Sequence, residues 1–144
     1  MTGPEQKQAR EALVRQWFGL WLHPAPFDIG QLFTDDALYI ESWGPQYRGA
    51  GAIRHWFDEW NTRGRVQQWD IRRFFHSDEE TVVLWTFRSR MNDGAADAFD
   101  GISLIRWQGA KMCRLQEFGC NRNRYDPYAG GGAPRFRDEP ARWF

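Results

Sequence analysis

The sequence predicts an α+β fold, with helices packed on one face of an antiparallel sheet. Three helical patterns come first in the chain, and strand-like segments follow them. Asn92-Asp93-Gly94 marks a tight hairpin between two of these segments, because such residues favour the turns that join antiparallel strands. Helices followed by a run of antiparallel strands are typical of α+β domains.

The first helix is expected from about Pro4 to Leu22, where Pro4 suits the first turn and apolar residues recur at helical spacing. His23-Pro24-Ala25-Pro26 ends it. A short second helix is expected from about Asp28 to Phe33, with Asp28 as its N-cap.

A short strand is predicted from Ala37 to Trp43, and Gly44-Pro45 then turns the chain. Gly49-Ala50-Gly51 leads into a third helix that ends at about Asn61. The apolar side chains of this helix form one stripe, which predicts a buried face. They are Ile53, Trp56, Phe57 and Trp60.

Four longer strands follow. They are expected at about Val66 to His76, Thr81 to Met91, Ala96 to Gln108 and Lys111 to Asn123. β-Branched and aromatic residues are frequent in them, as in strands generally. Strands of this length indicate a sheet that is strongly curved or bulged.

Length and composition indicate one domain over residues 1–128, followed by a Gly/Pro-rich spacer and C-terminal tail over 129–144. The tail is either loose or docks its final pair, Trp143-Phe144, on this subunit or a partner. Nineteen basic and nineteen acidic residues balance, which argues against nucleic acid as a partner.

Neither a signal-peptide pattern nor an apolar run of membrane-spanning length is visible, so no membrane contact is expected. Cys113 and Cys120 have an odd separation on one predicted strand and should point to opposite faces. We expect both to be small buried residues, unbridged, in a cytoplasmic protein.

The order of elements and several short motifs resemble the nuclear transport factor 2-like superfamily, and its SnoaL-like and ketosteroid-isomerase-like branch most closely. The motifs are Leu-Phe-Thr-Asp-Asp-Ala (32–37), Tyr-Arg-Gly (47–49), Ala-Ile-Arg-His-Trp-Phe (52–57), Phe-Asp-Gly-Ile-Ser (99–103) and Arg-Leu-Gln-Glu-Phe (114–118). The resemblance implies a cone, in which a curved antiparallel sheet wraps around three N-terminal helices and leaves a pocket at its open end. It also implies a homodimer.

Strand alternation predicts which side chains face that pocket. One face of the Thr81–Met91 strand is the expected wall, with Val83, Trp85, Phe87, Ser89 and Met91. The next two strands present Ala98, Asp100, Ile102 and Leu104, and Cys113, Leu115, Glu117 and Gly119. Each of those two faces holds one acid among small or apolar residues, which is costly unless the acid has a function or a partner.

Glu41, Asp100 and Glu117 are therefore the candidate catalytic residues. Resemblance to ketosteroid isomerases gives Glu41 the place of the general base and Asp100 that of a protonated acid stabilising an oxyanion, a role that the isomerase itself exemplifies. Trp17 stands where those enzymes carry a Tyr, which disfavours steroid isomerisation itself. The candidate ligand contacts are Trp17, Tyr39, Trp56, Phe57, Trp85, Phe87 and Leu115.

Two functions remain open. One is a proton-transfer enzyme, an isomerase, cyclase or dehydratase acting on an apolar carbonyl compound; the other is a non-catalytic module that binds a small apolar molecule or dimerises. Structural roles also remain open for the acids. Glu41 could be solvated or cap a turn, Asp100 could hold a neighbouring loop or pair with an Arg, and Glu117 could pair with Arg54 or a subunit partner. No spacing resembles a metal site or a phosphate loop, so neither metal nor cofactor is expected.

Overall fold

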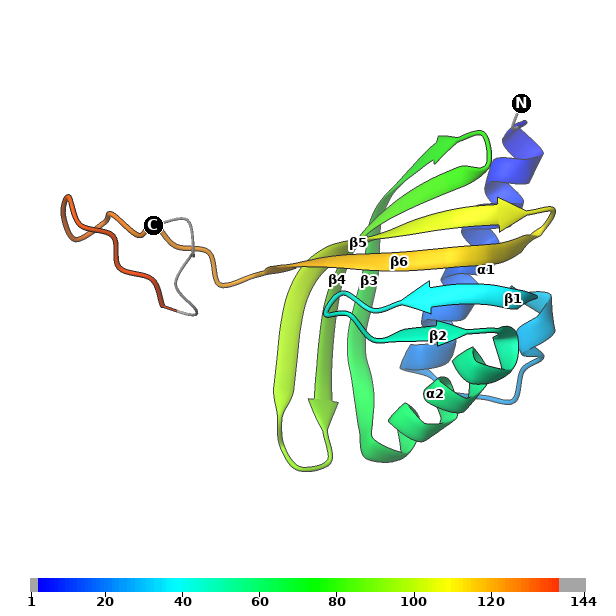
Figure 1. Ribbon diagram of the computed structural model, residues 1–144, viewed down its shortest axis with the longest axis horizontal. Helices are drawn as coiled ribbons and strands as arrows, with labels where there is room; N and C mark the ends of the chain where they lie inside the picture. The colour runs from blue at the N-terminus through cyan, green and yellow to red at the C-terminus, as the bar shows by residue number, and fades with distance from the viewer. Residues whose placement is uncertain (1–2, 138–144) are drawn as a thin grey trace.

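The computed structural model describes residues 3–137 (Figure 1). Its elements are α1 (Pro4–Leu22), the 3-10 helix η1 (Ile29–Gln31), β1 (Phe33–Ile40), β2 (Gln46–Arg48), α2 (Ala50–Arg63), β3 (Gly64–Ser77), β4 (Glu80–Met91), β5 (Ala96–Gln108) and β6 (Lys111–Asn121). The α+β prediction is confirmed, with two α-helices in this part of the chain where three helices were predicted. The segment after Asp28 forms only one 3-10 turn, which the Asp28 side chain caps as predicted.

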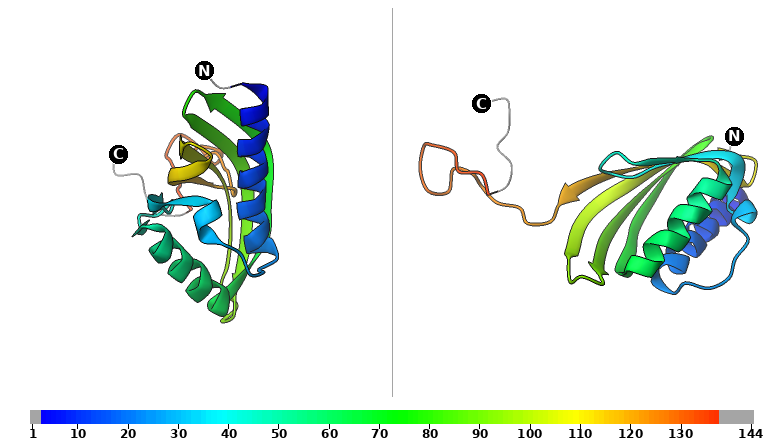
Figure 2. Two further views of the ribbon diagram at one scale, coloured as in Figure 1. Left: turned by 90° about the vertical axis from the view of Figure 1, so that its right-hand side faces the viewer. Right: turned by 60° about the horizontal axis from the view of Figure 1, so that its bottom comes forward.

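The six strands form one curved, open sheet in the order β2-β1-β6-β5-β4-β3. β1 pairs with β6 in parallel, and all other neighbours are antiparallel. The sheet curves around α1 and α2, which lie on its concave side (Figure 2). Register shifts in β3, after Val66 and after Ile71, contribute to the curvature because a bulge bends and twists its strand.

Aromatic side chains fill the space between the helices and the sheet. Trp17 of α1 is fully buried, and its ring lies 5.0 Å from Phe33 and 5.7 Å from Phe57, centroid to centroid. On the other side of α1, Phe18 stacks on Trp69 of β3 at 3.8 Å. Such contacts hold α1 across the concave face, since large rings bury more apolar area than any other side chain.

Three local predictions were wrong. The first strand begins at Phe33 and ends at Ile40, so Asp35 and Asp36 lie on an exposed part of a strand. No strand was predicted where β2 forms. Cys113 is half-buried and Cys120 exposed, rather than both buried, and both are free thiols.

Residues 122–137 form no helix or strand and extend away from the sheet (Figure 1). The predicted docking of Trp143-Phe144 lies outside the described residues. Neither described helix has the length and apolar character needed to cross a membrane.

Candidate functional site

A cavity of about 240 Å³ lies against the concave face of the sheet, between β3–β6 and the ends of the two helices. Its lining is dominated by aromatic rings, which come from every layer of the fold. They are Trp21 of α1, Trp43 of the β1–β2 turn, Trp56 and Trp60 of α2, Trp69 of β3, Trp85 and Phe87 of β4, and Phe99 of β5. We call this cavity the aromatic pocket.

The rings of the aromatic pocket position one another. Trp21 packs against both Trp56 and Trp60, at centroid distances of 4.9 and 5.4 Å. Trp56 in turn stacks on Tyr47 of β2 at 4.6 Å, with the planes only 12° apart. Because these rings are held by neighbours from other elements, this part of the pocket wall is fixed by the fold itself.

Glu117 reaches the pocket from β6. It pairs with Ser103 of β5, in a register that also sets Gly119 opposite Gly101 and Leu115 opposite Ile105. Gly101 has no room for a side chain, since an added Cβ would lie 2.5 Å from the Trp85 ring across the strand pair. The strand register thus turns Glu117 and the Trp85 ring toward the same side of the sheet.

Burial raises the pKa of the Glu117 carboxyl to about 7, and the nearby charge of Glu41 acts in the same direction. The Tyr39 hydroxyl donates a 2.5 Å hydrogen bond to Glu117, and this bond and one from the Ser42 backbone partly offset the rise by favouring the charged form. The same burial, together with Glu117, raises the pKa of Tyr39 well above its usual value. Glu117 is therefore poised to exchange a proton near neutral pH.

Glu41 follows the end of β1 and also lines the pocket. It accepts a 2.6 Å hydrogen bond from the Tyr47 hydroxyl. Burial raises its pKa, while hydrogen bonds from Tyr47 and Trp43 act against that rise. Glu41 and Glu117 thus each have a tyrosine hydroxyl as partner.

Among residues 3–137, the ionisable side chains that line the pocket are all acidic. Asp97 of the β4–β5 hairpin is the third acid that lines it, and the described lining residues include no Lys, Arg or His. Arg54, the predicted structural partner of Glu117, binds Asp58 instead at 3.0 Å. Within the described part of the chain, no group of three or more His, Cys, Asp or Glu is placed to hold a metal ion.

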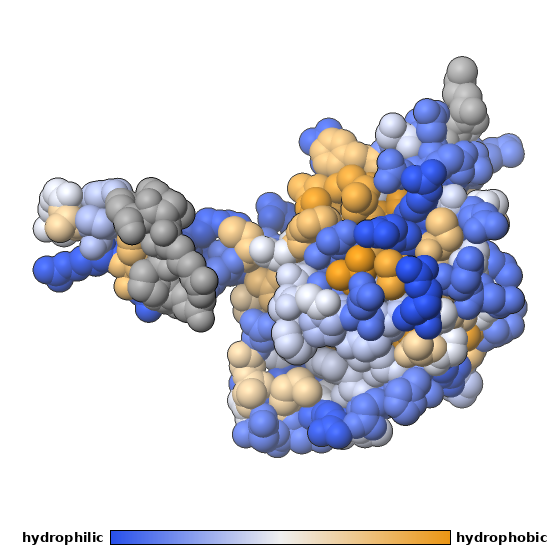
Figure 3. All heavy atoms as spheres, in the orientation of Figure 1, coloured by the Kyte–Doolittle hydropathy of each residue, from blue (hydrophilic) through white to orange (hydrophobic). Residues whose placement is uncertain are grey.

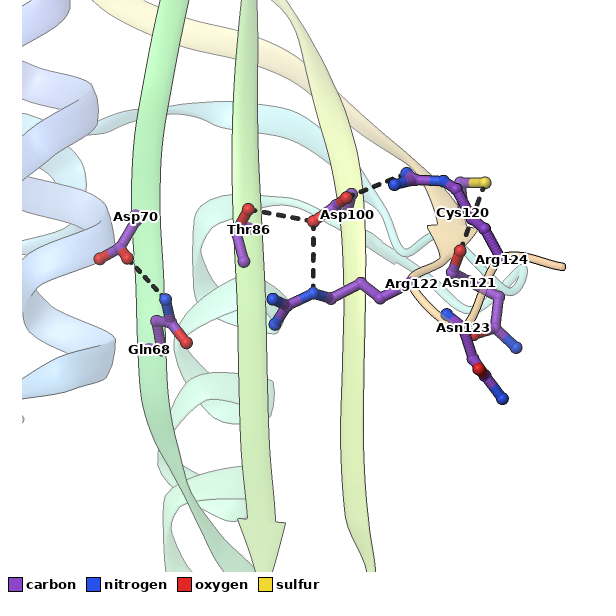
Figure 4. Close-up of polar contacts among 9 residues, drawn as sticks. All are labelled: Gln68, Asp70, Thr86, Asp100, Cys120, Asn121, Arg122, Asn123 and Arg124. Carbon is purple, nitrogen blue, oxygen red and sulfur yellow. Dashed lines mark hydrogen bonds and ion pairs between the residues drawn. The ribbon is translucent and has the colours of Figure 1, made fainter.

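Asp100 does not line the aromatic pocket, and its predicted orientation was wrong. It lies on the opposite face of the sheet, where it accepts a hydrogen bond from Thr86 and pairs with Arg122 and Arg124 (Figure 4). These partners lower its pKa, against the effect of burial. The cavity side of β5 carries Phe99, Gly101 and Ser103, so the predicted face was displaced by one residue.

Three of the seven predicted ligand contacts line the pocket: Trp56, Trp85 and Phe87. The other four, Trp17, Tyr39, Phe57 and Leu115, belong to the buried core. Sequence reasoning missed Trp21, Trp43, Trp60, Trp69, Phe99 and Asp97. Trp60 lies on the apolar stripe of α2 that was identified in the sequence, so this stripe could have predicted Trp60 as a pocket residue.

The SnoaL-like domain family matches residues 14–115. The match spans more than half of the 144 residues, and the chain belongs to this family. The comparison with curated proteins found no match.

Solved structures of low sequence identity share the fold. A Catenulispora acidiphila protein with a ketosteroid isomerase-like fold, in complex with trimethylamine, is 18% identical with a TM-score of 0.65, over 74% of this chain and 83% of that one. A candidate polyketide cyclase from Xanthomonas campestris is 14% identical, with a TM-score of 0.66 over 78% and 91%. An LEH-like epoxide hydrolase of M. tuberculosis is 13% identical, with a TM-score of 0.67 over 81% and 86%.

Proposed function

We propose that this protein binds a small molecule in the aromatic pocket and that Glu117 transfers a proton to or from it. The proposal rests on one observation: the Glu117 carboxyl, with a pKa of about 7, lies in a cavity whose lining is rich in aromatic rings. A group with this pKa gives up and regains a proton readily near neutrality, as a general acid–base catalyst must. The similarity to a candidate polyketide cyclase and to a protein solved with trimethylamine supports a small-molecule site.

In the reaction that this geometry favours, ionised Glu117 removes a proton from a carbon next to a carbonyl group. The electron pair moves to the carbonyl oxygen, and Glu117 then returns the proton to another atom of the same molecule. Tyr39 holds the carboxyl in place through its 2.5 Å hydrogen bond. Isomerisation, cyclisation and dehydration all begin with such a step.

The second candidate function is ligand binding without catalysis. One observation favours it: Asp100, the acid that would stabilise an oxyanion by resemblance, is paired with arginines on the other face of the sheet. The pocket then has Glu117 and Glu41 but lacks the acid donor expected beside them. Turnover of an identified ligand decides between the two functions.

Glu117→Gln is expected to lower kcat for a substrate of this protein by about 10²–10⁴-fold, the usual contribution of a general acid–base group. Asp100→Asn is the matched control, since it also replaces one acid by its amide but lies outside the pocket. We expect the control to keep its kcat. Steady-state kinetics on both variants would contradict the proposal if Glu117→Gln retained full turnover.

We also propose that the chain forms a homodimer through the outer face of its sheet. Leu84, Ile102 and Phe118 pair across three neighbouring strands and form an apolar row. Phe118 is 45% exposed, and apolar side chains gather on this face (Figure 3). An apolar patch of this kind on a soluble domain is typical of an interaction surface.

The dimer proposal predicts that Phe118→Asp converts the protein to a monomer, because a charge would have to be buried in the contact. Light scattering coupled to gel filtration measures the mass directly. A wild-type protein that elutes as a monomer at all concentrations would contradict the proposal. Trp43→Asp, at an exposed position on the pocket side, is the control that should leave the mass unchanged.

A further inference from the structure

We infer that the ligand of the aromatic pocket carries a positively charged nitrogen, as in a small alkylamine or a quaternary ammonium compound. This inference rests on the proposed small-molecule binding and narrows the class of molecule. Three features of the pocket lead to it: its rings, its charge and its size.

The first feature is the amount of indole surface. Six tryptophans line a single cavity, and Trp56 and Trp60 remain partly exposed within it, as do Phe87 and Phe99. The face of an aromatic ring attracts a cation within about 6 Å of its centroid, and tryptophan does so most strongly. Surrounding a quaternary ammonium group with several rings is a known use of this interaction.

The second feature is the charge around these rings. Glu41, Asp97 and Glu117 line the pocket, whereas its described lining contains no cationic side chain. Elsewhere in the chain, acids pair with arginines: Asp58 with Arg54 and Asp100 with Arg124.

Burying a carboxylate without a cation is costly, and this cost is why Glu117 holds its proton more tightly than an ordinary Glu. A ligand cation would supply the missing opposite charge. An anionic ligand would instead add to the repulsion.

The third feature is size. At about 240 Å³, the cavity is smaller than the range of about 300–1,000 Å³ typical of drug-sized ligands. A compact head group of the size of a trimethylammonium fits such a space better than a polycyclic compound does. The remainder of a longer ligand would extend past Trp43, which is largely exposed.

Cation binding and proton release are coupled at this site. The ionisable groups that face Glu117 are Tyr39 and Glu41, with Tyr47 close behind Glu41. A bound cation stabilises the ionised form of Glu117. The affinity of the protein for a cationic ligand should therefore rise as the pH increases through about 7. The same ionisation would leave Glu117 in the basic form that the proposed reaction needs.

The test compares two compounds of nearly the same shape, choline and 3,3-dimethyl-1-butanol, in which a neutral carbon replaces the charged nitrogen. Titration of the wild-type protein at pH 8, followed by tryptophan fluorescence and calorimetry, gives both affinities. We expect choline to bind at least about tenfold more tightly, the preference that a desolvated cation–π contact provides. Glu117→Gln should reduce this preference, because the carboxylate that pairs with the cation is lost while the rings remain. Asp100→Asn should keep it.

Trp60→Leu provides a second variant should Glu117→Gln fold poorly, because Trp60 lies partly exposed on α2. It should weaken choline binding more than binding of the alcohol. If the alcohol binds as tightly as choline, the cation inference is wrong while small-molecule binding stands. If neither compound binds up to about 10 mM, the cation inference is wrong, while the small-molecule proposal is still tested by the turnover of Glu117→Gln.

Discussion

Replacing Trp17 with Ala is expected to lower the free energy of unfolding by about 3–5 kcal/mol, the usual cost of removing a large buried ring. Trp17 is 0% exposed and contacts rings from α1, β1 and α2. Its loss would leave a cavity that these rigid neighbours could fill only in part. Urea unfolding followed by circular dichroism measures the change.

Trp43→Ala is the matched control, since the same residue type is 78% exposed in the β1–β2 turn. Its free energy of unfolding should stay within about 0.5 kcal/mol of wild type. The sequence placed Trp17 among the ligand contacts, whereas the structure places it in the core. A Trp17→Ala protein of normal stability but impaired ligand binding would restore the first interpretation.

The second large effect is the pH dependence that Glu117 gives to the free energy of unfolding. Its pKa is about 7 in the folded protein, against the ordinary value of 4.5 for a solvated Glu. Between these values the folded state retains a proton that the unfolded state has released, so stability falls as the pH rises from about 4.5 to about 7. The loss amounts to about 3 kcal/mol above that range.

Glu117→Gln removes this titration and isolates the effect from all other groups. Between pH 4 and pH 8 the free energy of unfolding of the variant, measured relative to wild type, should therefore rise by about 3 kcal/mol. Glu41, whose pKa is also raised by burial, contributes in the same direction to both proteins and cancels largely in this comparison. A difference between the two proteins that is independent of pH would contradict the account of Glu117.

Local sequence signals predicted the long elements well. α1 runs from Pro4 to Leu22 and β5 from Ala96 to Gln108, with the predicted bounds. The first strand was misplaced because Asp35 and Asp36 belong to a residue type that is depleted in strands. In the structure they lie in the stretch between Phe33 and Leu38 where the β1–β6 register shifts, and both are exposed.

The residues of β5 alone could not predict which face of this strand turns toward the pocket. Both faces of this strand are half apolar, since one lies toward the helices and the other toward the outer apolar row. Only the register with β4, which sets Gly101 opposite Trp85 and Asp100 opposite Thr86, decides that Asp100 points outward. The alternative weighed from sequence, that Asp100 pairs with an Arg, is confirmed.

The part of the pocket lining that was predicted came from local patterns, namely alternation along β4 and the apolar stripe of α2 that contains Trp56. Trp85 and Phe87 followed from alternation along β4, whereas Trp21, Trp60 and Trp69 meet there through the packing of α1 and α2 on the sheet. A register shift in β3 between Val66 and Gln68 also breaks the alternation that would have revealed Trp69. Long-range packing and bulges of this kind leave no local trace in a sequence.

We propose that the aromatic pocket encloses an acid, Glu117, whose proton is exchanged near neutral pH. The most direct test is a carbon-13 NMR titration of the glutamate side-chain carboxyls, with the Glu117 signal assigned by its absence in Glu117→Gln. We expect a midpoint near pH 7 for this signal. A midpoint near the ordinary value of 4.5 would contradict this expectation, because the carboxyl would then be solvated rather than enclosed by the rings.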